Sequence, residues 1–351
     1  MVRKLLILLL LLPLLALPAG ASQTMNEVEI ELPAEAQAYM PDSENGFLSG
    51  FLEVLQKAFL AVVPGLRESV AVCAGVLAAT ILCALFQAGD TGLRTPTANL
   101  LGAAAIGALL LRQTDVLIRQ GLETIQAISD FGKLLLPVMS ASLVASGGSV
   151  TASALYLGTA LFDSVLSSLI SKLLAPLLYL FLALSLGSAA IGSGMLGRMR
   201  DFFKNVITWG LKGILSVFSA YMAITGVVSG SADATAVKLT KMTISGMVPV
   251  VGGILSDATE TVLVGASAVR STAGVTGLLA VLALTAVPFL ELVMQYLLLK
   301  LTSALCGVVG TPEHGAVTEG FAQAMGLILA MVGTGCLLQL ISIVCFMKGV
   351  G

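Results

Sequence analysis

The 351 residues carry a formal net charge of −2, and 57% of them are hydrophobic while only 11% are charged. A soluble domain has about 25% charged residues, so this composition, with a mean hydropathy of +1.00, indicates an integral membrane protein. The Lys and Arg residues fall singly between apolar runs and form no basic stripe, which argues against nucleic acid as a partner.

The N-terminus has the pattern of a signal peptide, residues 1–21. Arg3 and Lys4 precede a long apolar run, and the small residues Ala19-Gly20-Ala21 fit a signal peptidase site. Cleavage would make Ser22 the first residue of the mature chain. The alternative is an uncleaved signal anchor, and in both cases we expect the next segment to be exported.

Residues 22–45 are acidic and contain no Lys or Arg, so we expect them on the exported side of the membrane. Residues 46–65 predict an amphipathic helix in the membrane interface, because large apolar residues recur every four positions. A turn into the membrane is expected at Pro64-Gly65. The recurring residues are Phe47, Phe51, Leu55 and Phe59.

Residues 66–351 predict one all-α, multi-pass membrane domain. A helix needs about 20 apolar residues to cross the hydrocarbon core, and about seven segments meet that requirement. They are Ser69 to Ala88, Thr95 to Leu111, Leu174 to Leu196, Gly213 to Ala232, Ser271 to Leu290, Leu292 to Gly310 and Gly320 to Met347.

Two more apolar segments, Leu134 to Phe162 and Met242 to Val269, are expected to be re-entrant hairpins or broken helices. Each has an early proline, which removes a helix hydrogen bond, and a glycine pair, which permits a sharp turn. A single kinked helix is the alternative, and the likeness of the two segments suggests an internal repeat. The residues concerned are Pro137, Gly147, Gly148, Pro249, Gly252 and Gly253.

The distribution of positive charge predicts the orientation. Arg198, Arg200, Lys204 and Lys212 form the most basic connection, which should lie in the cytoplasm. An exported N-terminus reaches that connection on the correct side if the first interrupted segment enters and leaves by one face. With both interrupted segments re-entrant, the chain ends in the cytoplasm at Lys348.

Carboxylates inside apolar segments are candidates for function, because an ionised group at mid-bilayer costs about 2.5 to 3.5 kcal/mol. Asp257 and Glu260 lie three residues apart after the second glycine pair, so they could line a polar path or bind a cation. Solvated charges in the membrane interface are the alternative. Lys300 and Glu291 lie in one apolar run, where Lys300 could reach the interface or form an ion pair.

Small residues four positions apart indicate close helix packing, as in Ser188 with Gly192 and Gly226 with Gly230. The contact could be internal, with a second copy or with a partner. Gly192 also begins a dinucleotide-like Gly-x-Gly-x-x-Gly string, which we regard as accidental because it closes an apolar helix and has no strand before it.

No residue set predicts catalysis or a cofactor. The five cysteines lie in apolar runs without Cys-x-x-Cys spacing, which is typical of small buried side chains. The sequence contains no His-Glu-x-x-His or Gly-x-Ser-x-Gly motif, so neither a metal site nor a catalytic triad is expected. His314, the single histidine, is expected in a solvated loop.

Two strings in their order along the chain resemble the stage III sporulation protein AE family. The first runs from Val144 to Ala152 and contains Ser146-Gly147-Gly148-Ser149; the second is Val248-Pro249-Val250-Val251-Gly252-Gly253 followed by Ser256-Asp257-Ala258-Thr259-Glu260-Thr261-Val262. The resemblance covers roughly Phe47 to Val350. It implies a multi-pass subunit of a channel or secretion-like complex that joins mother cell and forespore, in the mother-cell membrane around the forespore.

Two functions therefore compete. The first is a non-enzymatic subunit that packs against other membrane subunits of the sporulation complex and supports the forespore after engulfment. The second is a secondary transporter with inverted repeats, in which Asp257 or Glu260 couples an ion at a midplane site.

Overall fold

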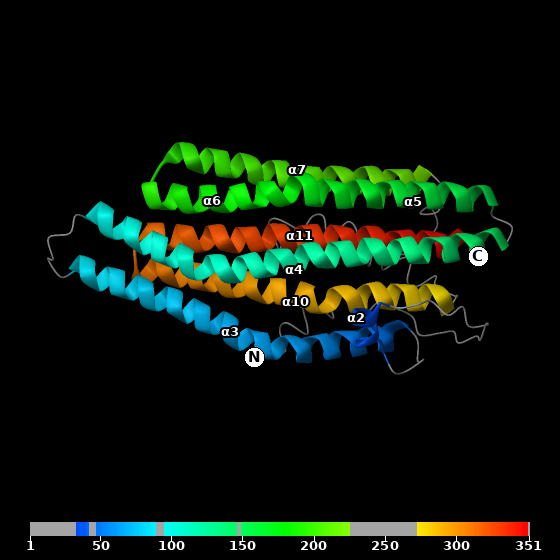
Figure 1. Ribbon diagram of the computed structural model, residues 1–351, viewed down its shortest axis with the longest axis horizontal. Helices are drawn as coiled ribbons and strands as arrows, with labels where there is room; N and C mark the ends of the chain where they lie inside the picture. The colour runs from blue at the N-terminus through cyan, green and yellow to red at the C-terminus, as the bar shows by residue number, and fades with distance from the viewer. Residues whose placement is uncertain (1–32, 42–46, 89–94, 146–148, 225–271, 350–351) are drawn as a thin grey trace, which may run out of the picture.

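The computed structural model describes residues 33–41, 47–88, 95–145, 149–224 and 272–349 (Figure 1). Within these residues the regular structure is entirely helical, which confirms the all-α prediction. The helices are α2 (Ala34–Gln37), α3 (Phe47–Ala88), α4 (Thr95–Ala145), α5 (Ser149–Leu169), η1 (Ile170–Leu174), α6 (Ala175–Ile191), α7 (Gly194–Ile224), α10 (Thr272–Val309) and α11 (Pro312–Gly349).

The long helices lie side by side along one axis, and α5, η1 and α6 follow each other as one rod (Figure 1). At 1.5 Å per residue, α10 and α11 are each about 57 Å long and α4 is about 75 Å long. The hydrocarbon core of a bilayer is about 30 Å thick, so each of these helices is longer than one crossing requires.

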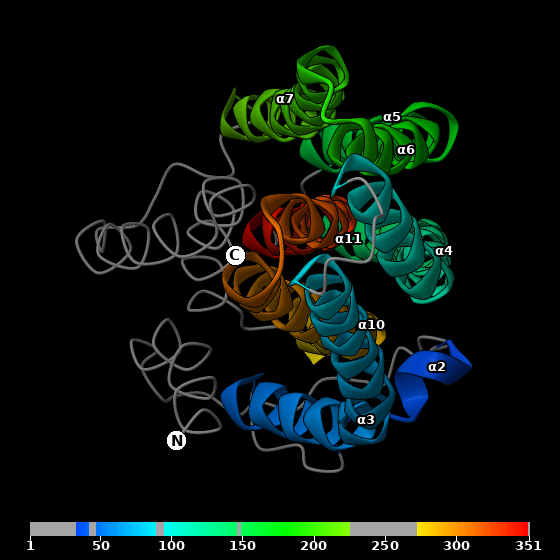
Figure 2. The same ribbon diagram turned by 90° about the vertical axis from the view of Figure 1, so that its left-hand side faces the viewer.

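Helix α11 lies at the centre of the bundle, in contact with α4, α5, α6, α7 and α10 (Figure 2). In its most apolar stretch 94% of the residues are buried, against 17% in the corresponding stretch of the peripheral α3. A helix that is apolar on all sides is expected in a core, and small residues let its neighbours approach. A Cβ at Gly320 would lie 2.6 Å from the Cβ of Ser185 on α6.

Five helical stretches in the described residues are long and apolar enough to cross a membrane, which supports the membrane prediction but not the count of about seven. They are Phe47–Phe86, Leu100–Ala141, Ala152–Ile191, Gly274–Val309 and Pro312–Met347. Helix α7 is absent from this set.

The separate crossings predicted at Ser271 to Leu290 and Leu292 to Gly310 are wrong, because both ranges lie within α10. Glu291, which divides them in the sequence, stays inside the helix and accepts a hydrogen bond from Gln120 of α4 at 2.5 Å. A single polar residue with a partner does not end a helix.

The turn expected at Pro64-Gly65 is also wrong. Pro64 lies inside α3, which continues to Ala88. Figure 1 shows that α3 changes direction partway along its length, as a helix does where proline removes one backbone hydrogen bond. The predicted interfacial segment is therefore the first part of a longer helix.

The first interrupted segment, Leu134 to Phe162, contains a reversal of the chain between two long antiparallel helices (Figure 1). Pro137 lies inside α4, which continues to Ala145, and α5 begins at Ser149. Within the described residues each half of the segment thus belongs to a separate long helix, which excludes the alternative of a single kinked helix. The second interrupted segment, Met242 to Val269, lies outside the described residues.

A π-helical turn, η1, connects α5 with α6. Pro176 follows it and has no N–H to donate to the preceding turn. The wider π-helical turn accommodates the absence of this hydrogen bond, so the helical rod continues from Ser149 to Ile191.

Helix α3 begins and α11 ends at the same end of the bundle (Figure 1). If the bundle crosses one membrane along its length, these two ends lie on the same side. The expectation of an exported N-terminal segment together with a cytoplasmic C-terminus does not agree with this arrangement.

Candidate functional site

Polar side chains that are buried or partly buried link α3, α4 and α10. The Gln113 amide of α4 donates to Ser69 Oγ of α3 at 2.8 Å and to Gln295 Oε1 of α10 at 3.3 Å. Buried polar groups need partners, because an unpaired one costs about 1–3 kcal/mol. These hydrogen bonds therefore fix the register of three helices in an otherwise apolar interior.

A second group of polar side chains joins α7, α10 and α11. Lys300 forms an ion pair with Glu319, and Gln323 Nε2 donates to Glu319 Oε1 at 2.9 Å. Lys204 of α7 donates to Gln323 Oε1 at 3.2 Å. The pairing alternative predicted for Lys300 is thus the one observed.

The Lys204 ammonium has an unfavourable environment. Burial lowers its pKa below the ordinary value of 10.5, and the nearby charges of Arg200 and Lys300 act in the same direction, while Asp201 and Glu319 oppose them. The positive charge is therefore less stable in the folded protein than in water.

A third group lies between α4 and α5. Ser129 Oγ donates to Asp163 Oδ2 at 2.7 Å, and these side chains are only 2% and 7% exposed. Lys133, the nearest cation on α4, forms its ion pair with the exposed Asp130. Asp163 belongs to no ion pair found among the described residues.

Two fully buried polar side chains without hydrogen-bond partners accompany this third group. They are Thr159, one turn before Asp163 on α5, and Gln339 of α11, each 0% exposed. The Gln339 amide packs against Gly132 of α4, where a Cβ would lie 2.6 Å from Nε2. Ser129 and Gly132 are one turn apart on α4, so α4, α5 and α11 all contribute to the group.

His314 is buried, so the prediction of a solvated loop histidine is wrong. The chain turns at Thr311, α11 begins at Pro312, and the imidazole points against α4 in the first turn of the new helix. A Cβ at Gly102 would lie 2.3 Å from His314 Nε2 and 2.9 Å from Cys83 Sγ. Neither ring nitrogen has a hydrogen-bond partner.

The outer face of α4 is polar over its middle part. Tyr179 of α6 donates to Asp115 at 2.8 Å, and Arg119 pairs with the same carboxylate at 2.9 Å. Charged and amide side chains facing lipid would be costly, so this face requires water or a polar partner. Its exposed residues are Arg112, Arg119, Glu123, Gln126, Asp130 and Lys133.

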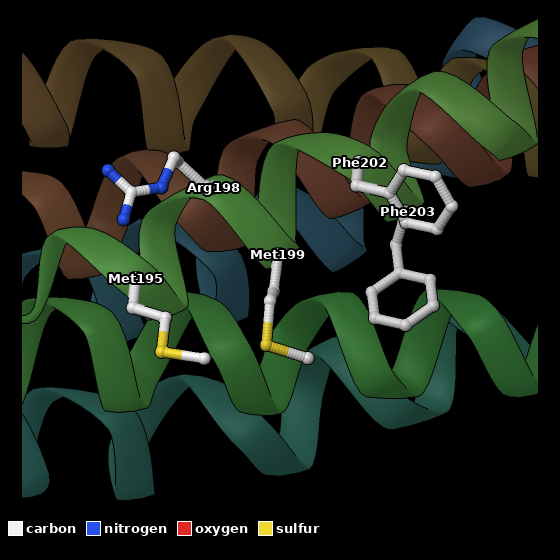
Figure 3. Close-up of a pocket in the computed structure, with 5 residues that line it drawn as sticks. All are labelled: Met195, Arg198, Met199, Phe202 and Phe203. Atoms are coloured by element: carbon white, nitrogen blue, oxygen red, sulfur yellow. The ribbon is translucent and has the colours of Figure 1, made fainter.

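Helix α7 presents a shallow apolar pocket (Figure 3). Met195 and Met199 extend to one side and Arg198 points away from them, with the aromatic pair Phe202 and Phe203 further along the helix (Figure 3). All five lining residues belong to α7, so the pocket is a feature of one helix surface and not an enclosed site.

Most of the predicted site residues lie outside the part of the chain that the structure describes. Gly147, Gly148, Gly226, Gly230, Pro249, Gly252, Gly253, Asp257 and Glu260 lie outside the described residues. Gly192 ends α6 with a left-handed backbone, φ +67°, and a Cβ there would contact nothing within 4 Å. Ser188 belongs to α6 and faces α7, where its Oγ is 3.6 Å from a Cβ built at Gly197.

The residues with buried polar contacts were largely missed from sequence. Asp163 is the one charged residue between Ser149 and Ser171. Its isolation in an apolar stretch is the signal by which the sequence could have identified it. Gln113, Gln339 and the glycines of α4 gave no signal of their own. Their importance depends on which helix each one faces.

No group of three His, Cys, Asp or Glu side chains in the described ranges could hold a metal ion. The described residues define a helical membrane protein built around one buried central helix, in which polar side chains join neighbouring helices. The chain belongs to the stage III sporulation protein AE family, whose model matches residues 36–349. This is a sporulation family and not a known enzyme family.

A curated relative supports the assignment. The stage III sporulation protein AE of Bacillus subtilis (strain 168) is 22% identical over 293 residues, which cover 80% of this chain and 73% of the relative. No solved structure matches the chain.

Proposed function

We propose that the chain is a non-enzymatic, multi-pass subunit of a channel or secretion-like complex that joins mother cell and forespore and is required after engulfment. Family membership is the single observation that carries this proposal. The architecture is compatible with it, because the interior is filled by α11 and helix-to-helix contacts. Its partners would be other membrane subunits of the complex, in the mother-cell membrane around the forespore.

The orientation follows from two sequence features and the helix order. An exported segment before α3 puts the start of α3 outside, and Arg198 and Arg200, at the opposite end near the start of α7, favour the cytoplasm. Both features agree on one orientation of the bundle. The end of α11 then lies on the exported side with the start of α3.

Fusions to the full-length chain test this orientation. Alkaline phosphatase fused after residue 351 should be active, and a fluorescent protein fused there should be dark, as after export through the general pathway. A phosphatase inserted between α6 and α7, beside Gly192, should be inactive. A fluorescent C-terminal fusion would contradict the proposed orientation.

Deletion and complementation test the role. A clean deletion should arrest sporulation after engulfment, and the wild-type chain expressed in the mother cell alone should restore spores. Normal spore yield in the deletion, or rescue only from forespore expression, would contradict the proposal.

The transporter alternative makes a separate prediction. In it, Asp257 and Glu260 line a polar path, and the purified protein alone moves a solute across liposomes. The variants Asp257→Asn and Glu260→Gln should then lose this activity. Solute movement that needs these carboxylates would favour the transporter over the packing subunit.

A further inference from the structure

A junction of α4, α5 and α11 contains a buried carboxylate with one hydroxyl partner, and the helices that meet there also carry two buried, unpartnered polar side chains. Asp163 is 7% exposed and accepts one hydrogen bond, from Ser129 Oγ at 2.7 Å. Figures 1 and 2 show α4, α5 and α11 as neighbours, and the packing of Gln339 against Gly132 brings α11 to the same part of α4.

Asp163 forms no ion pair with a cation of the described residues, although Lys133 is near enough to act on its charge. The Lys133 ammonium pairs with Asp130 at 2.8 Å on the exposed side of α4. A buried anion with one hydroxyl partner is unfavourable, because burial removes the water that would solvate the carboxylate. One bound positive charge would balance Asp163.

The neighbouring groups are suited to a cation. Gln339 carries a side-chain oxygen and Thr159 a hydroxyl, both 0% exposed and without any hydrogen-bond partner. Thr159 and Asp163 share one face of α5, since they are four residues apart. Hard cations bind carboxylate, carbonyl and hydroxyl oxygens, and this set has no nitrogen or sulfur ligand that would favour zinc or copper.

We propose that Asp163, Ser129, Thr159 and Gln339 form a binding site for a monovalent alkali cation, Na⁺ or K⁺. A single carboxylate matches one positive charge, whereas a divalent ion would remain half neutralised. The site at Gln113, Gln295 and Thr114 also has unpartnered polar atoms but no carboxylate, so it does not attract a cation in this way. Bound cation would hold α4, α5 and α11 together, independently of the role in sporulation.

Thermal unfolding of the full-length protein in detergent tests the site. Wild-type protein is titrated with NaCl, KCl or choline chloride at constant ionic strength, with EDTA present to remove divalent ions. The melting temperature should rise saturably with Na⁺ or K⁺ and not with choline. Asp163→Asn should abolish this response.

Two further variants keep the test decisive if Asp163→Asn does not fold. Thr159→Val and Gln339→Leu retain the carboxylate and remove one oxygen each, so they should weaken the cation response at least about tenfold in concentration. The control Asp115→Asn removes a carboxylate that pairs with Arg119 on the exposed face of α4, away from Asp163, and should leave the response unchanged.

Several results would overturn the proposal. A wild-type melting temperature that is equal in all three salts would mean that Asp163 is protonated and needs no cation. A response lost equally in Asp115→Asn would assign it to surface charge, and a response seen only when EDTA is omitted would assign it to a divalent ion.

Discussion

At Gly320 the central helix packs closely against α6. A Cβ there would lie 2.6 Å from the Ser185 Cβ, and the Ser185 side chain is 1% exposed, so it has little room to move. We expect Gly320→Ala to destabilise the protein by about 1–3 kcal/mol through overpacking. Thermal unfolding in detergent measures the effect.

Gly75 provides a matched control for this substitution. It lies in the middle of α3, and a Cβ there would contact nothing within 4 Å. Gly75→Ala should leave stability unchanged or raise it by up to about 1 kcal/mol, because alanine favours the helix. Equal losses in both variants would show that close helix contact is not the cause.

Lys300 and Glu319 offer a test of the polar link between α10 and α11. Their side chains are 38% and 29% exposed, so water screens the attraction between the two charges only in part. Lys300→Met leaves the Glu319 carboxylate with only Gln323 as a partner, and we expect a loss of about 1 kcal/mol because water screens part of the pair. The exchanged pair Lys300→Glu with Glu319→Lys should recover part of that loss, and a double variant as unstable as the sum of the singles would argue against pairing.

Lys204 predicts a pH dependence of stability. Its pKa is lowered in the folded protein, chiefly by burial, so between that value and 10.5 the unfolded chain binds more protons than the folded one. Stability therefore rises as the pH increases through this window and falls as the pH decreases through it, and below the folded pKa this contribution no longer changes. Unfolding of wild-type and Lys204→Met between pH 7 and 10.5 should show this rise in the wild type only, and parallel curves would contradict it.

At the scale of single elements, the end of α6 depends on the backbone of Gly192. Its φ of +67° is left-handed, and its N–H donates to the Ser188 carbonyl at 3.0 Å. A Cβ in this conformation costs about 1–2 kcal/mol, although nothing crowds it. Gly192→Ala should therefore lower the unfolding free energy by about that amount, while Gly192→Asn should lose less, as measured by thermal unfolding.

The apolar composition of the helices was readable from sequence, but their ends were not. Pro64 and Pro288 both lie inside long helices, since loss of one backbone bond is offset when the helix packs against neighbours. The charge of Glu291 separates two predicted crossings in the sequence. In the structure its partner Gln120, which is distant in sequence, lets it stay inside one helix. Local signals thus suggested breaks that tertiary contacts prevent.

The buried polar groups show why site prediction stopped where it did. Lys300 could be identified as a residue that needs a partner, because an unpaired charge in an apolar run is costly. Its partner Glu319 lies in the next helix, and the sequence contains no rule that pairs the two. His314 shows the opposite case. Its place after a turn predicts a solvated side chain, but the missing side chain of Gly102 leaves space for the imidazole inside the bundle.

At the scale of the whole molecule, the polar outer face of α4 restricts where the bilayer can lie. Glu123 and Lys133 are exposed on this face, so the hydrocarbon core does not cover that part of α4. In nanodiscs, with native cysteines replaced, Glu123→Cys should react rapidly with a water-soluble maleimide. Leu101→Cys and Leu157→Cys lie towards opposite ends of the bundle, and the one in the bilayer should be protected.

This labelling experiment has a clear contrary outcome. Protection of Glu123→Cys in a nanodisc that contains only the purified protein would place the charged face in lipid. Labelling in the nanodisc but protection in cells would instead indicate that a partner covers this face.

The length of the central helices has a consequence for assembly. Helices of about 57 Å, even at the common tilt of about 20°, span more than a hydrocarbon core of about 30 Å, so part of the bundle lies outside the hydrocarbon. A partner that binds the part of the bundle outside the hydrocarbon binds it in water, where burial of apolar surface drives association. It would carry the negative heat-capacity change that contacts formed wholly within lipid lack.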